Sequence, residues 1–102
     1  MISLLEDKRE DLVRLCEKYR VRRLEVFGSA AHGEFDPRSS DLDFLVEYQE
    51  LEPVQHADAY FDLLAELEDL FQLQIDLVEI GAVRNPYFKK TVDKDRTLVY
   101  EG

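Results

Sequence analysis

Asp41 and Asp43, separated by one apolar residue, are the side chains whose types and spacing best suit a chemical role. Along residues 41–48 the pattern alternates, so Leu42, Phe44 and Val46 face one side of a strand and both aspartates face the other. Two carboxylates about 6–7 Å apart on one face repel each other unless a cation neutralises them. Two Mg²⁺ ions would do this, since they prefer carboxylate oxygens and can stabilise both the attacking and the leaving oxygen of a displacement at phosphorus. A solvated edge strand is the alternative, and the pair alone does not exclude it.

A third carboxylate, Asp76, lies between apolar residues in the segment 74–78. Aspartate is disfavoured inside a strand, so its presence in a strand expected beside the first pair indicates a role. Asp76 is predicted to complete a metal site and to act as the base that deprotonates an attacking hydroxyl. An exposed position on an alternating strand is the alternative.

Gly28 and Ser29 directly follow the apolar segment 24–27. A glycine lets the backbone approach a phosphate closely, and a serine that begins a short helix adds a hydroxyl and free N–H groups at the positive end of the helix dipole. The pair is therefore a candidate triphosphate cradle. It is not a P-loop, because the chain has no Gly-x-x-x-x-Gly-Lys-Ser/Thr segment.

Local patterns predict the elements that must position these residues. Apolar residues at helical spacing predict two helices, over residues 3–19 and 56–71. Capping and turn residues predict helical turns at 29–32, a loop at 34–40 and the start of a helix at Asn85-Pro86. Strands are predicted at 24–27, 41–48, 74–80 and 97–100. The order α-β-α-β-α-β-α-β predicts an α/β (α+β) fold, with a small mixed sheet flanked by helices in a single domain over 1–102.

Composition bounds the class of protein. The chain has 102 residues, of which 45% are hydrophobic and 35% charged, as in an ordinary globular domain. Its formal net charge of −10 argues against direct binding of nucleic acid, since an acidic surface repels phosphate backbones, although solubility alone also explains the charge. A single cysteine, Cys16, and the lack of a long apolar run predict a cytoplasmic protein that does not bind a membrane. One Cys and two His residues give no zinc pattern, and Ser29 lacks the Gly-x-Ser-x-Gly elbow of a serine hydrolase.

The order and spacing of these motifs resemble the signature of the polymerase-beta-like nucleotidyltransferases. The signature has Gly-Ser at a strand end, then 11 residues, then Asp-apolar-Asp, and finally a lone Asp on a later strand. Within that superfamily the chain is similar to the minimal nucleotidyltransferases over nearly its whole length, including residues 85–88 and 97–100. The resemblance implies a polymerase-beta-like core, ATP as the nucleotide donor and two Mg²⁺ ions. It also implies roles for individual residues: Gly28 and Ser29 would hold the triphosphate, Asp41 and Asp43 the metals, and Asp76 would be the third metal ligand and the base.

Residues 28–33 depart from the family pattern. Many relatives carry Gly-Ser-x-Ala-Arg-Gly, and here His32 stands where the arginine is common. A neutral imidazole stabilises phosphate charge less well than a guanidinium, so a lower nucleotide affinity or rate is expected unless Arg38 in the following loop compensates. His32 and Arg38 are both candidate nucleotide-binding residues, with a solvated turn histidine as the alternative for His32.

Members of this group often sit beside a HEPN-domain protein, a helical partner that can act as an RNA-cleaving toxin. The resemblance implies an antitoxin that transfers AMP from ATP to a tyrosine of such a partner, as a hetero-oligomer or a homodimer. A non-catalytic antitoxin that neutralises the partner by covering it is the first alternative, and three crowded carboxylates argue against it. Adenylylation of a small molecule is the second, disfavoured because a core of this size has little with which to form a drug pocket.

Overall fold

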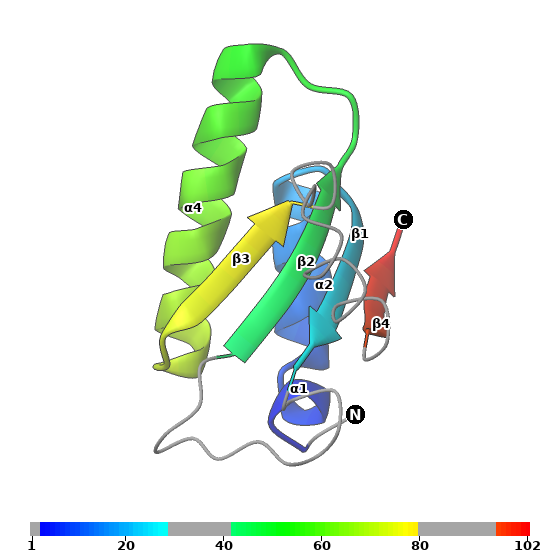
Figure 1. Cartoon of the computed structure of the whole chain (residues 1–102), viewed down its shortest axis with the longest axis vertical. Coiled ribbons are helices and arrows are strands. Elements are labelled where there is room, and N and C mark those ends of the chain that lie inside the picture. The colour runs from blue at the N-terminus through cyan, green and yellow to red at the C-terminus, as the bar shows by residue number, and fades with distance from the viewer. Residues whose placement is uncertain (1–2, 29–41, 80–95) are drawn as a thin grey trace.

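The computed structural model describes residues 3–28, 42–79 and 96–102, which form three helices and four strands (Figure 1). The helices are α1 (Ser3–Asp7), α2 (Arg9–Lys18) and α4 (Pro53–Phe71), and the strands are β1 (Val21–Phe27), β2 (Leu42–Tyr48), β3 (Ile75–Glu79) and β4 (Thr97–Glu101). The turns predicted at 29–32, the loop at 34–40 and the helix start at Asn85-Pro86 lie outside the described residues. Within the described ranges, no helix combines the length and apolar character that a membrane crossing needs.

The four strands form one mixed sheet in the order β3-β2-β1-β4. β1 is antiparallel to both β2 and β4, whereas β2 and β3 are parallel. Parallel neighbours need a crossover connection, and α4 supplies it between β2 and β3. The predicted α/β fold with a small mixed sheet is confirmed.

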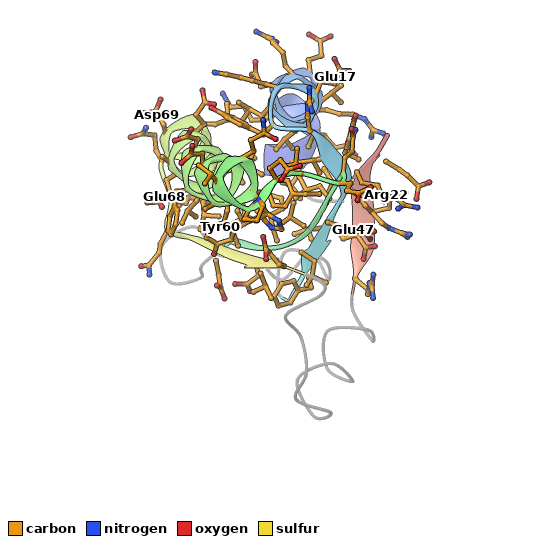
Figure 2. All side chains as sticks on the ribbon, turned by 90° about the horizontal axis from the view of Figure 1, so that it is seen from above. Glu17, Arg22, Glu47, Tyr60, Glu68 and Asp69 are labelled. Atoms are coloured by element: carbon orange, nitrogen blue, oxygen red, sulfur yellow. The ribbon has the colours of Figure 1, made fainter. Side chains whose placement is uncertain are left out.

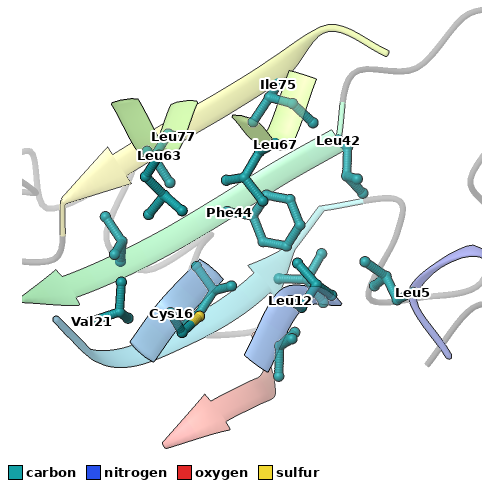
Figure 3. Packing of buried hydrophobic residues seen from close by; sticks show 14 of the residues in the cluster. Leu5, Leu12, Cys16, Val21, Leu42, Phe44, Leu63, Leu67, Ile75 and Leu77 are labelled. Atoms are coloured by element: carbon teal, nitrogen blue, oxygen red, sulfur yellow. The ribbon is translucent and has the colours of Figure 1, made fainter. Parts of the chain in front are cut away.

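The hydrophobic core lies between one face of the sheet and the helices α2 and α4 (Figures 2 and 3). The predicted alternation of β2 is confirmed, because Leu42, Phe44 and Val46 are all fully buried in this core. The ring of Phe44 lies 6.1 Å from that of Phe71, centroid to centroid, so β2 is tied to the last turn of α4. Cys16 also belongs to the core, and burial raises its pKa to about 12, so the thiol stays protonated at neutral pH.

The N-terminal helix is interrupted at Lys8, which corrects the prediction of one helix over 3–19. Lys8 has φ −106° and ψ 11°, and its N–H bonds to the carbonyl oxygen of Leu5 at 3.3 Å. Leu5 and Leu12 are nevertheless both buried in the same core. The apolar pattern therefore continues across the break, which is why the sequence pattern does not reveal it.

Local sequence explains where α4 begins and ends. Pro53 stands in its first turn, where no N–H is required for the helix and the fixed φ favours helix entry. At the other end Gln72 adopts a left-handed conformation, with φ 53°, and its N–H bonds to the carbonyl oxygen of Glu68 at 2.8 Å. This turn reverses the chain so that β3 can start at Ile75.

Glu25 is a buried carboxylate on β1, with 1% of its surface exposed. It accepts hydrogen bonds from Arg96 Nε and from Arg96 Nη2, the latter at 2.9 Å, and forms an ion pair with Arg23. The hydrogen bonds from Arg96 hold the pKa of Glu25 below its ordinary value, against the opposing effect of burial. Because Arg96 directly precedes β4, this pair fastens β4 to β1.

We expect Glu25→Gln to lower the free energy of unfolding by roughly 1–3 kcal/mol at neutral pH, because both arginines lose a charged partner. A carboxylate whose pKa is depressed by folding stabilises the folded state above its unfolded pKa, and this contribution disappears as the pH falls through the folded pKa. In urea denaturation, the difference in the free energy of unfolding between wild type and variant should be largest above the ordinary pKa of 4.5. It should disappear as the pH falls below that value. Glu10→Gln, at an exposed position of α2, is the control. If this difference in the free energy of unfolding stays the same in acid, the charge of Glu25 contributes nothing to stability.

Candidate active site

Three strand ends meet at one end of the sheet. The last residues of β1 lie beside the first residues of β2 because these strands are antiparallel, and β3 starts beside the start of β2 because those two are parallel. In this register Asp43 is the Cα partner of Phe27 on one side and of Asp76 on the other. Neighbouring strands lie about 4.8 Å apart, so two aspartates from distant segments of the chain are adjacent across the sheet.

Both aspartates lie on the sheet face opposite the helices. The residues before and after each of them belong to the core, and successive side chains of a strand point to opposite faces. On the aspartates' face, Phe27 and Leu45 form a second small apolar cluster, with Val78 packed against it. Asp43 is half-buried and Asp76 is exposed, so this end of the open face presents carboxylate oxygens to solvent.

Gly28 lies directly against the carboxylate of Asp43. Its φ is +72°, in the left-handed region, and a Cβ added to it would lie 2.8 Å from Asp43 Oδ2. A side chain at this position would therefore both strain the backbone and displace the carboxylate. The Asp43 carboxylate therefore keeps this position only with no side chain at residue 28.

The described side chains fit part of a divalent metal site. Asp43 and Asp76 offer carboxylate oxygens, the ligands that Mg²⁺ prefers, and they are Cα partners on neighbouring strands. Among residues 3–28, 42–79 and 96–102, no group of three acidic, histidine or cysteine side chains could hold a metal ion. A third protein ligand would have to come from elsewhere in the chain, and Asp41 is the predicted one.

The other predicted site residues are Ser29, His32, Arg38 and Asp41, and all four lie outside the described residues. Ser29 directly follows Gly28, and Asp41 directly precedes β2, so both adjoin the described site along the chain. Their roles in binding phosphate and metal, and those of His32 and Arg38, stay predictions.

Sequence reasoning missed one charged group next to this site. Glu25 is the Cα partner of Leu45, and it lies two residues before Phe27, so its side chain shares the face of the aspartates. A glutamate inside the apolar segment 24–27 was the available signal. Its partner Arg96 is 71 residues away in the sequence, and no local pattern connects them.

The sequence and the fold of this chain are similar to those of known proteins. A family model described as a nucleotidyltransferase domain matches residues 9–99. MJ0128 of Methanocaldococcus jannaschii, a predicted protein adenylyltransferase, is 41% identical over 86 residues, which cover 84% of this chain and 82% of that protein. The solved structure of a predicted minimal nucleotidyltransferase has a TM-score of 0.74 and 30% identity, covering 94% of this chain and 95% of the other.

A more distant solved structure shares the fold. It contains a tri-AMPylated HEPN toxin of Shewanella oneidensis in complex with its MNT antitoxin. The matched chain has a TM-score of 0.66 and 15% identity, with 96% of this chain and 73% of that chain covered. At this identity the likeness concerns the fold alone.

We expect Gly28→Ala to lower the free energy of unfolding by about 1–2 kcal/mol, the usual cost of a left-handed conformation for a residue with a Cβ, plus the cost of moving the Asp43 carboxylate. The second contribution can be isolated, because Asp43→Ala removes the atom that the new Cβ would meet. In a double-mutant cycle measured by urea denaturation, Gly28→Ala should cost at least about 0.5 kcal/mol less in the Asp43→Ala background. Equal costs in both backgrounds would contradict the close approach of Gly28 to Asp43.

Proposed function

This chain belongs to the nucleotidyltransferase domain family, and from that premise we propose that it transfers AMP from ATP to a tyrosine hydroxyl of a HEPN-type toxin and so acts as an antitoxin. The observation that carries this proposal is the juxtaposition of Gly28, Asp43 and Asp76 at one end of the open sheet face. A nucleotidyltransferase needs carboxylates beside backbone that a phosphate can approach, and the two aspartates and the glycine are residue types suited to these roles.

The reaction is a displacement at the α-phosphorus of ATP. The acceptor oxygen forms the new P–O bond, the bond to the bridging oxygen breaks, and pyrophosphate leaves with the electron pair. Asp76, exposed at the start of β3, accepts the proton of the attacking hydroxyl. Asp43 and Asp76 would hold Mg²⁺ together with Asp41, and Mg²⁺ bound there would neutralise the carboxylates and the charge of the triphosphate.

The backbone at the end of β1 is suited to hold the triphosphate. Gly28 has no side chain to keep a phosphate away from the backbone or from Asp43. Ser29, which follows it, would add a hydroxyl and an N–H to the phosphate oxygens. His32 and Arg38 would add to this binding, His32 less strongly than the arginine common at that position.

Two observations favour a protein as the acceptor: the charge of this chain, and the partner found in the solved complex of a protein with the same fold. The net charge of −10 opposes the approach of a polynucleotide. The solved complex of a tri-AMPylated HEPN toxin with its MNT antitoxin shares the fold of this chain, which supports a HEPN-domain protein as the acceptor. The reaction is proposed to take place in the cytoplasm, where ATP is available and where the unpaired Cys16 would remain reduced.

Intact mass spectrometry tests this proposal. Incubation of the chain with ATP, Mg²⁺ and a HEPN-domain protein, taken from a neighbouring gene where one exists, should add whole AMP units to that protein, at tyrosine. Asp76→Asn is expected to slow the transfer by about 10²–10⁴-fold, the usual contribution of a general base, and Asp43→Asn by at least as much. Chelation of Mg²⁺ should abolish the transfer.

Glu10→Gln provides the matched control, since it makes the same carboxylate-to-amide change at an exposed position of α2, on the helix-covered side of the sheet. It should leave the rate unchanged. If the wild-type chain binds the HEPN-domain protein and neutralises it without adding mass, and the two Asn variants neutralise it equally well, the protein is a binding antitoxin and the proposed reaction is wrong.

A further inference from the structure

A groove of about 690 Å³ runs between α4 and the edge strand β3, which lie side by side in Figure 1. One wall is a stripe on α4 whose members follow each other at helical steps of three, one, three and one: Pro53, His56, Ala57, Tyr60 and Phe61. The other wall is the end of β3, formed by Leu77, Val78 and Glu79. The volume lies within the range of sites that bind ligands or side-chain anchors.

This stripe is separate from the stripe by which α4 packs on the sheet. The core-facing residues of α4 are Ala59, Leu63, Leu67 and Phe71, and all four are buried. Phe61 in the groove is 66% exposed, and Val54, two helical turns earlier on α4, is 73% exposed. These are the two most exposed large apolar side chains in the described part of the chain. The helix therefore has a second apolar surface that the described fold leaves uncovered.

The polar groups of the groove are already held in place. Tyr60 donates a hydrogen bond of 2.6 Å from its hydroxyl to the carbonyl oxygen of Leu77. His56 Nε2 lies 2.5 Å from Glu79 Oε1. Both contacts link α4 to β3 across the groove floor, so the apolar surface is preformed and a bound group would not have to order it first.

The charge of the chain bears on what can occupy the groove. The formal net charge is −10, and α4 carries five acidic residues and no lysine or arginine. Glu79 lines the groove itself, whereas Asp58 and Asp62 line a separate hollow on another flank of α4. Two copies of so acidic a chain repel each other, which opposes a homodimer, and a polynucleotide is opposed for the same reason. A protein segment with apolar anchors and flanking lysine or arginine residues is complementary both to the groove and to the charge of the chain.

The groove lies near Asp76 along β3. Val78, which lines it, is on the same face of β3 as Asp76, two residues away along the strand, or roughly 7 Å. A protein seated in the groove therefore reaches the open face at the place where a hydroxyl must approach Asp76. We propose that the α4–β3 groove is the docking site for the acceptor protein, which enters it through an apolar segment flanked by basic residues. This inference rests on the proposed function for the identity of the acceptor.

Phe61→Glu tests the docking site, because this exposed position tolerates a charge without loss of the core. With the HEPN-domain protein as the probe, we expect its affinity, measured by isothermal titration calorimetry, to fall at least tenfold. The rate of AMP transfer at low partner concentration should fall in parallel, while the rate at saturating partner and the binding of a fluorescent ATP analogue should stay unchanged. Raising the salt concentration should slow association, because salt screens the attraction between a basic segment and this acidic chain.

Leu98→Gln is the control, since Leu98 is a 44% exposed apolar residue on β4, at the opposite edge of the sheet. The change adds no charge, as is needed because Leu98 is the Cα partner of Glu25. It should leave both affinity and transfer unchanged. Urea denaturation and circular dichroism of each variant establish that it is folded.

The outcomes separate the two proposals. If Phe61→Glu weakens binding of a partner that the wild type never modifies, the groove is the docking site and the proposed reaction is wrong. If the wild type and Phe61→Glu both modify the partner, and both reach half of their maximal rate at the same partner concentration, the proposed reaction stands and the docking site is wrong. A wild-type chain that does not bind the partner also overturns the docking site. So does a wild-type homodimer that Phe61→Glu converts to a monomer in analytical ultracentrifugation, since the groove is then filled by a second copy.

Discussion

The hydrogen-bonded register of β2 between β1 and β3 is the constraint on which the other features depend. It brings Phe27, Asp43 and Asp76 into one row, although they come from three separate segments. Side chains alternate along a strand, so a slip of one residue would move Asp43 into the core and an apolar neighbour onto the open face. The burial of Leu42, Phe44 and Val46 on the other face opposes such a slip. Packing on one side of the sheet thus fixes the chemistry on the other.

The helices cover only one face of the sheet, so the two faces differ in their surroundings and in their residues. On the helix side, α2 and α4 seal the core, and the buried Cys16 behaves there as one more apolar group. On the open side the apolar cluster is small, and the charged residues Asp43, Asp76 and Glu25 belong to that face of the sheet, Glu25 being buried. Of these, Glu25 is neutralised by arginines within the fold. Asp76 is exposed and Asp43 is half-buried, so the oxygens of both remain within reach of solvent.

Much of this could be predicted from the sequence, because the relevant patterns are local. The alternation of β2, the apolar stripe of α4 and the approach of Asp76 to Asp43 are all confirmed. The break at Lys8 could not be predicted, because the buried residues Leu5 and Leu12 fit one continuous helix equally well. Neither the pairing of Glu25 with Arg96 nor the second stripe on α4 could be predicted, since both depend on which elements become neighbours in space. Polar side chains that meet only after folding leave no spacing signal.

The hydrogen bond from Tyr60 to the carbonyl oxygen of Leu77 has a consequence for how the molecule behaves at high concentration. Among the described strands β3 is outermost in the sheet, and an uncovered outer strand offers its backbone groups as a template on which foreign strands can add. Leu77 is the middle residue of β3, so the hydroxyl occupies an acceptor that an added strand would need to continue its ladder. The contact removes one acceptor from the outer edge of β3, so the strand that carries Asp76 is a poorer template for the edge-to-edge growth that leads to fibrils.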